Sequence, residues 1–318
     1  MTIEQNPSVF DPITHRRIRF DNTVLKDFRA CAMRGFLRYQ RHLVPASYVG
    51  HPKPIALVFG TWIHSALAVY YRTKDLTQAQ NIIIDGFGPM YEEAGYDDKT
   101  RTPDRALDMI LAYAKHWATA TMEMELVCSE LFFEFPLFIH TLPDGTQEQI
   151  YYCGKIDEVL RHKGKIVGMD HKTTWSLSSA FIESMRISQQ FLGYVMWLKR
   201  HSGWSEDWSG YFYPDFLLTA KSSSRGDGGM PFYRETLLCD DEMLDDWLVD
   251  AVSQVKLYKE YEDGTRMPVK NTDACNDYNR LCMYFYGCSA VPEMRESHWQ
   301  TAFIEEPWEP GRLDEDAT

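Results

Sequence analysis

Apolar residues in the first third of the chain recur mainly at helical spacing. Residues 22–42 predict a helix that Asn22 or Thr23 would cap, with a partial apolar stripe. Prolines and glycines then predict a loop. Residues 55–72 predict an apolar helix, at least after Gly60, and residues 104–126 predict another.

The period changes to two in the middle of the chain. Aromatic and β-branched residues predict strands over 131–140, 149–161 and 166–172. Short turns at Pro143-Asp144-Gly145 and Lys163-Gly164 would join them into an antiparallel meander. A helix over 178–200, a strand over 210–218 and a helix over 241–262 should follow. The fold class is therefore α/β, with a mixed sheet flanked by helices.

Composition restricts the class of protein. Of 318 residues, 44% are hydrophobic and 25% are charged, which is typical of a globular chain. No apolar run approaches the roughly 18 residues that a membrane helix needs, and residues 1–12 lack a secretory h-region, so we expect a cytoplasmic protein with no membrane partner. Seven cysteines without an export signal indicate reduced thiols or metal ligands.

The net charge of −13 conceals a basic segment. Residues 16–41 hold eight arginines and lysines against two aspartates, a local charge of +6. Arg34, Arg38 and Arg41 would share one face of the expected helix and contact DNA phosphates, or they would form an ordinary solvated face.

Two carboxylates and a lysine fall at positions where they would meet. Asp170 and Lys172 are two residues apart on an expected strand and therefore share a face, and Asp157 lies on the neighbouring strand. Carboxylates that hold Mg²⁺ or Mn²⁺, with a lysine beside them, are the equipment of phosphodiester hydrolysis. The alternative is a strand pair with ordinary surface charges.

Further motifs stand in a fixed order around this constellation. A G-x-x-x-H motif ends at His64, G-x-x-D ends at Asp157, D-x-K-T begins at Asp170, and Q-x-x-x-Y joins Gln190 to Tyr194, with Gln189 as an alternative register. This ordered set resembles the RecB-like branch of the PD-(D/E)XK nuclease superfamily. That branch includes the AddB nuclease domain, CRISPR-adaptation nucleases and phage exonucleases. The resemblance covers roughly residues 22–290.

The resemblance implies a role for each matched residue. His64, Asp157, Asp170 and the backbone carbonyl of His171 would bind Mg²⁺ or Mn²⁺, and Lys172 would be the catalytic lysine. Gln190 and Tyr194 would position the DNA backbone or the active-site strand. Relatives often carry a glutamate on the preceding strand, and both Glu130 and Glu134 are candidates. Asp170 stands where many relatives have glutamate.

Three cysteines gather near the C-terminus. Cys275, Cys282 and Cys288 form C-x6-C-x5-C, and Cys31 in the basic segment is the candidate fourth ligand. The resemblance implies a 4Fe–4S cluster on these four residues, although the x6 spacing is longer than in some relatives. A Zn²⁺ site and unliganded thiols are the alternatives.

The resemblance implies a single nuclease domain with a restriction-endonuclease-like core over residues 1–304. It would comprise a mainly helical part (22–126), a catalytic sheet and helix (127–220) and a segment with the last helix and cysteines (221–304). An acidic tail (305–318) would follow.

The expected activity is that of a Mg²⁺- or Mn²⁺-dependent DNA nuclease, an exonuclease on single-stranded DNA or DNA ends in recombination, repair or phage DNA processing. DNA is the expected partner, with a helicase or recombination protein as a further one. The rivals are a structure-specific endonuclease of an adaptation complex, an inactive iron–sulfur DNA-binding or scaffold subunit, and a zinc-binding interaction module.

Overall fold

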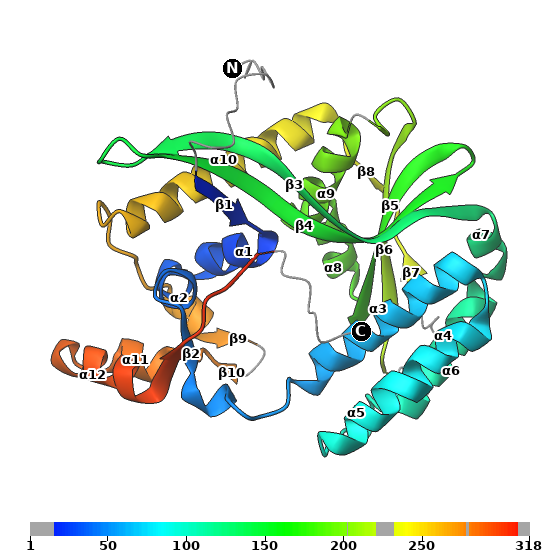
Figure 1. Ribbon diagram of the computed structural model, residues 1–318, viewed down its shortest axis with the longest axis horizontal. Coiled ribbons are helices and arrows are strands. Elements are labelled where there is room, and N and C mark those ends of the chain that lie inside the picture. The colour runs from blue at the N-terminus through cyan, green and yellow to red at the C-terminus, as the bar shows by residue number, and fades with distance from the viewer. Residues whose placement is uncertain (1–15, 202, 221–231, 278–279, 311–318) are drawn as a thin grey trace. The chain divides into compact units, whose positions relative to one another are not determined.

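The computed structural model describes residues 16–201, 203–220, 232–277 and 280–310 (Figure 1). The chain divides into two compact units, each assembled from several stretches. The first unit contains residues 1–46, 134–154 and 248–318, and the second contains 47–133 and 155–247. The single domain over residues 1–304 stays a prediction. In the described residues, no helix has the length and apolar character needed to cross a membrane.

The second unit begins with a group of helices. α3 (Ile55–Thr73) is followed by α4 (Leu76–Ile82), a π-helical turn (Ile83–Phe87), α5 (Gly88–Glu93), α6 (Pro103–His116) and α7 (Ala118–Met122). The start of α6 follows from its sequence, because the Thr102 side chain accepts a hydrogen bond from the backbone N–H of Arg105 and Pro103 occupies the first turn.

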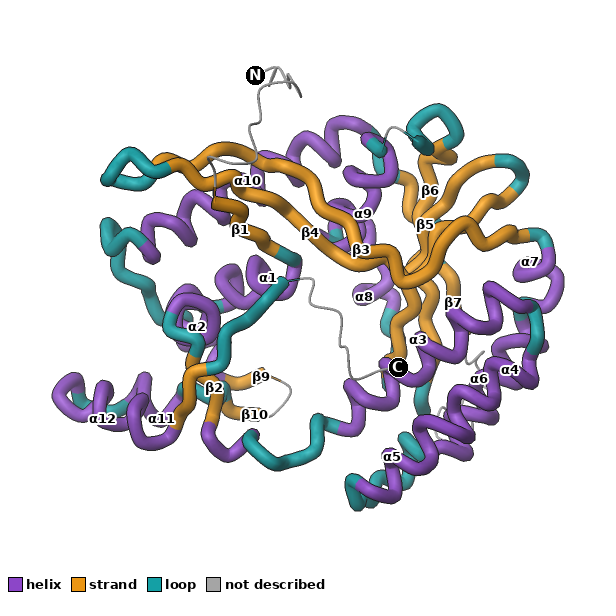
Figure 2. Tube along the Cα trace, viewed as in Figure 1, coloured by secondary structure: helices purple, strands orange, loops and turns teal. Residues whose placement is uncertain are grey.

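The sheet follows these helices in the chain. Its long strands are β3 (Met124–Thr141), β4 (Gln147–His162), β5 (Lys165–Thr174) and β6 (Trp208–Leu218), and β7 (Phe232–Arg234) and β8 (Leu237–Leu238) pair with β6. β5 runs antiparallel to β4 and parallel to β6, so the predicted mixed sheet is confirmed (Figure 2). α8 (Ser179–Ser184) and α9 (Gln189–Arg200) connect β5 to β6.

Alternation along β5 assigns its residues to two faces. Val167 and Met169 belong to the core formed with α3, α4 and α6. Gly168 faces the other way, where a Cβ would come within 2.7 Å of Leu198 in α9. The two groups of helices therefore cover opposite faces of the strand (Figure 1). By the same alternation, Asp170 and Lys172 share the α9 face.

The first unit combines both ends of the described chain. It contains β1 (Arg16–Phe20), α1 (Asn22–Ala30), α2 (Ala32–Gly35), a π-helical turn (Phe36–Gln40), β2 (Leu43–Pro45), most of α10 (Asp241–Glu262), β9 (Asn276–Asp277), β10 (Arg280–Leu281), α11 (Phe285–Ser289), α12 (Pro292–Ala302) and β11 (Phe303–Glu305). β2 pairs with β11, and Leu37, Leu43, Tyr284, Trp299 and Phe303 form a small core beside that pair.

Three predicted helices are shorter than expected. The helix over 22–42 is broken at Cys31, whose backbone is extended (φ −160°, ψ 113°). The helix over 104–126 ends at His116, and β3 already begins at Met124. The helix over 178–200 is interrupted at Ser188. Conversely, α3 begins at Ile55, ahead of Gly60. Of the predicted tail, Glu305 ends β11, and residues 311–318 lie outside the described residues.

Candidate active site and cysteine cavity

The second unit brings His64, Asp157, Asp170 and Lys172 to one place. α3 supplies His64, β4 supplies Asp157, and β5 supplies the other two. The His64 Nδ1 atom lies 3.3 Å from Asp157 Oδ2, and the backbone N–H of His171 donates to the same oxygen at 2.7 Å. The Lys172 ammonium contacts Asp170 Oδ2. Three of the sequence motifs therefore converge.

The two carboxylates differ in their electrostatics. The pKa of Asp170 is raised to about 6, mainly by burial and also by the negative charge of Asp157, while Lys172 opposes the rise. Burial also acts on Asp157, but the positive charge and hydrogen bond of His64, together with Lys172, hold its pKa well below the usual value. The Lys172 side chain is half-buried. Desolvation lowers its pKa, but the charges of Asp170 and Asp157 raise it above the usual value, which keeps the side chain charged.

The donor set suits a hard divalent cation. Two buried carboxylates and an imidazole are the ligand types that Mg²⁺ and Mn²⁺ accept. Asp157 and Asp170 are buried carboxylates on adjacent strands, and a divalent ion would neutralise their charge. In the part of the chain that the structure describes, no three His, Cys, Asp or Glu side chains form a completed site. Asp157 is turned toward His64 and Asp170 toward Lys172.

Gln190 and Tyr194 lie on α9, which covers the same face of β5 as Lys172. Gln190 Nε2 donates to the Tyr194 hydroxyl at 2.7 Å, and the Tyr194 ring is buried. The Lys172 ammonium lies 5.9 Å from the centroid of the intervening Phe191 ring. The carbonyl of Gln189, the alternative register, accepts a hydrogen bond from Trp247.

The two candidate glutamates lie in different units. Glu130 forms an ion pair with Lys155 in the second unit, at a point where its positive φ of 54° distorts β3. Glu134 belongs to the first unit and pairs with Arg17 and Arg19. Glu134 is therefore ion-paired with the basic segment, and Glu130 is the candidate additional acid in the same unit as Asp157.

A buried charged network, which was not predicted from the sequence, lies on the opposite face of β5. The His171 ring is fully buried, with Nε2 2.8 Å from Glu158 Oε2 and Nδ1 2.9 Å from Asp215 Oδ2. Burial lowers the pKa of His171, but the two carboxylates raise it well above the ordinary value. Arg234 Nε donates to Asp215 at 2.9 Å.

Two tyrosines complete this network. The Tyr113 hydroxyl of α6 donates to Asp215 Oδ2 at 2.6 Å. The Tyr71 hydroxyl of α3 lies 2.9 Å from the Tyr113 hydroxyl. Arg234 donates to both hydroxyls. Asp215 left one signal in the sequence: it is a lone acid inside the otherwise apolar run YFYPDFLL. Burying such a charge costs several kcal/mol unless it is paired.

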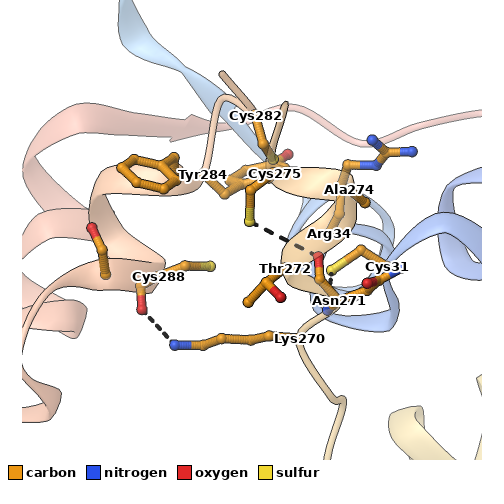
Figure 3. A pocket seen from close by; sticks show the side chains of 12 residues that line it. Cys31, Arg34, Lys270, Asn271, Thr272, Ala274, Cys275, Cys282, Tyr284 and Cys288 are labelled. Atoms are coloured by element: carbon orange, nitrogen blue, oxygen red, sulfur yellow. Dashed lines mark hydrogen bonds between the residues drawn. The ribbon is translucent and has the colours of Figure 1, made fainter. Parts of the chain in front are cut away.

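The four predicted cluster cysteines surround one cavity in the first unit (Figure 3). Cys31, Cys275, Cys282 and Cys288 all line this space of about 220 Å³, and none is in a disulfide. The backbone N–H of Asn271 donates to Cys31 Sγ at 3.4 Å.

Two cations, Arg34 and Lys270, also line the cavity. Burial raises the pKa of Cys282 and Cys288, and the charges of Arg34 and Lys270, respectively, oppose that rise.

The three arginines predicted to contact DNA make internal contacts in the first unit. Arg34 pairs with Asp27 at 2.8 Å. Arg38 donates to the carbonyl of Glu306 at 2.8 Å, and Arg41 makes a bidentate pair with Glu296 at 3.0 and 2.8 Å. Both Arg34 and Arg38 follow the break at Cys31: Arg34 lies in α2, and Arg38 lies in the π-helical turn that continues it. Their contact with DNA stays a prediction.

The chain was compared with known proteins. A family model of the PD-(D/E)XK nuclease superfamily matches residues 22–288. No curated protein sequence matches the chain significantly. Among solved structures, a protein from Eubacterium rectale provisionally described as an exonuclease is 13% identical, with a TM-score of 0.46 over 93% of this chain and 98% of that one. The structure of SSO0001 is 12% identical, with a TM-score of 0.29 over 77% and 91%.

Proposed function

The chain belongs to the PD-(D/E)XK nuclease superfamily, and we propose that it is a nuclease that hydrolyses DNA phosphodiesters with Mg²⁺ or Mn²⁺. The observation that carries this proposal is that two buried carboxylates, Asp157 and Asp170, lie in contact with His64 and Lys172. Ionisable groups with perturbed pKa values in one place are characteristic of catalytic sites.

Each residue has a distinct task in this proposal. His64, Asp157, Asp170 and the His171 carbonyl would hold the metal ion. The bound ion supplies Lewis acidity and lowers the pKa of its water. Lys172 remains charged beside Asp170, so its ammonium can orient the attacking water or stabilise charge on the phosphate. Gln190 and Tyr194 are joined by a hydrogen bond and would position the DNA backbone.

We further propose exonuclease action on single-stranded DNA or DNA ends, in the cytoplasm, in recombination, repair or phage DNA processing beside a helicase or recombination partner. The family motifs in their order support this assignment. A structure-specific endonuclease would share the site, and cleavage of a circular DNA without ends would identify it.

The test is cleavage of single- and double-stranded DNA labelled at either end, with Mg²⁺, Mn²⁺ or chelator. Asp157→Asn and Lys172→Met should each lower the rate at least 100-fold. Lys165→Met is the matched control, because Lys165 lies on the same strand and its exposed ammonium donates to the backbone carbonyl of Glu206. Full activity of both site variants, or metal-independent cleavage, would refute the proposed site.

We also propose that a 4Fe–4S cluster occupies the cysteine cavity. Four free cysteines from two distant segments fit the four-thiolate ligand set, and a space of about 220 Å³ exceeds what a single ion needs. Arg34 and Lys270 beside the sulfurs would favour thiolates. Such a cluster would link the segment after α1 to the segment around α11 and stabilise the first unit.

Anaerobic purification tests the cluster. We expect about four irons per chain and an absorption band near 400 nm, both lost in Cys282→Ser. Cys239→Ser, a buried cysteine of the second unit, is the control and should keep both signals. One zinc per chain without iron would instead establish the zinc alternative.

A further inference from the structure

His171 lies on β5 and contacts the other two elements that carry the proposed metal ligands, α3 and β4. Its ring approaches Glu158, the residue after Asp157 on β4, and its backbone N–H holds the Asp157 carboxylate itself. Asp170 precedes it on β5. The His64 ring of α3 lies 6.0 Å from the His171 ring, centroid to centroid. One residue therefore contacts α3 and β4 from its place on β5.

The imidazole is itself held rigidly. Both ring nitrogens face carboxylate oxygens at 2.8 and 2.9 Å, which leaves the ring no other orientation that keeps both contacts. The Asp215 carboxylate in turn accepts hydrogen bonds from Arg234 and Tyr113. All these residues belong to the second unit. His171, Asp215 and Tyr113 are fully buried, and the Arg234 side chain is only 7% exposed.

The network extends to the helix that supplies His64. Tyr71 lies seven residues after His64 on α3, two helical turns along the same face. Its hydroxyl shares a hydrogen bond with the Tyr113 hydroxyl and accepts another from the Arg234 guanidinium, and its ring centroid lies 5.8 Å from that of His171. The rotation of α3, and so the direction of His64, is thereby fixed relative to β5.

We propose that the His171 side chain is a positioning residue for the metal site: held between Glu158 and Asp215, it sets the spacing of His64, Asp157 and Asp170. This inference rests on the proposed nuclease function, because it concerns the same metal ligands. Groups behind metal ligands that fix their orientation typically contribute 10- to 100-fold to metal affinity. A buried network that only stabilised the fold would have no such effect.

The experiment measures Mn²⁺ binding directly, by the electron paramagnetic resonance signal of the free ion, beside the Mn²⁺ dependence of DNA cleavage. His171→Gln should raise the Mn²⁺ dissociation constant about 10- to 100-fold, with cleavage partly restored at high Mn²⁺. Tyr113→Phe removes one hydroxyl but keeps the ring, and should raise the Mn²⁺ dissociation constant by about 3- to 10-fold. Phe87→Leu is the control, since Phe87 packs among the helices of the same unit.

The outcomes separate this inference from the proposed function. The inference is supported if the two network variants weaken Mn²⁺ binding and Phe87→Leu, although less stable, does not. It is overturned if His171→Gln or Tyr113→Phe loses stability but binds Mn²⁺ as the natural protein does, while Asp157→Asn abolishes binding. If the natural protein and Asp157→Asn bind Mn²⁺ equally poorly, the proposed metal site itself is wrong.

Discussion

A buried ion pair in the first unit offers a stringent test of the structure. Lys259 Nζ of α10 lies 2.7 Å from Glu148 Oε2 of β4, and both side chains are only 2% exposed. Lys259 also contacts Glu262, and Arg16 stands 3.6 Å from the other oxygen of Glu148. The change Lys259→Met would leave the Glu148 carboxylate buried without its main partner.

The expected cost follows from that burial. Removing one partner of a buried pair destabilises a protein by about 3–5 kcal/mol. Arg16 remains near Glu148, so we expect the lower end, about 3 kcal/mol. With a urea m-value of about 2 kcal/mol/M, the unfolding midpoint should fall by about 1.5 M. The double variant Glu148→Leu/Lys259→Met should recover most of this loss, because no uncompensated charge remains.

Urea unfolding, with amide hydrogen exchange of peptides from residues 147–154 and 255–262, would measure the effect. Lys256→Met is the matched control: Lys256 lies on the same helix but is exposed, so its free energy of unfolding should change by less than about 0.5 kcal/mol. If Lys259→Met changed stability no more than this control, the pair would not be buried in solution and the packing of α10 on β4 would be wrong.

Two further predictions concern the second unit. Gly168→Ala should lower the free energy of unfolding by about 1–3 kcal/mol in thermal unfolding, because the added Cβ would lie 2.6 Å from the Phe212 ring. Gly88→Ala is the control and should be neutral or stabilising, since its Cβ would have its nearest contact at 3.7 Å and the residue is helical. Equal effects of the two changes would contradict the packing of α9 on β5. Burial raises the pKa of Asp98, but hydrogen bonds from Thr100 and Arg101 lower it to about 2. Its stabilising effect should therefore be complete above about pH 4 and decline as the pH falls toward 2. Asp98→Asn should cost about 1 kcal/mol at pH 7 and less at pH 3 in urea unfolding, and a difference independent of pH would refute this.

Local patterns were sufficient to predict the sheet and the grouping of Asp157, Asp170 and Lys172 on two neighbouring strands. Alternation put Asp170 and Lys172 on one face of β5, and the turn at Lys163-Gly164 put Asp157 on the adjacent strand, both as the structure has them. These features depend on residues close in sequence. The same reasoning extended the first helix through Cys31, because helical periodicity continues across that residue while the break depends on tertiary contacts.

The network around His171 could not be predicted in the same way. Tyr71, Tyr113, Glu158, Asp215 and Arg234 come from five separate elements, and no spacing in the sequence relates them. An acidic residue in an apolar run, such as Asp215, indicates that a buried partner exists but does not identify the partner. The partner is decided by how α3 and α6 pack on the sheet, which is a property of the whole second unit.

The composition of the first unit has a consequence for how the protein is made. Cys31 lines the same cavity as Cys288, and β2 pairs with β11, so this unit needs residues from around 31 and around 303 together. During synthesis at about 5–20 residues per second, some tens of seconds separate the two segments. Residues 47–247 leave the ribosome in that interval, so the second unit can fold first. Cys31 can therefore meet the other three cysteines only after the segment up to residue 288 has been synthesised.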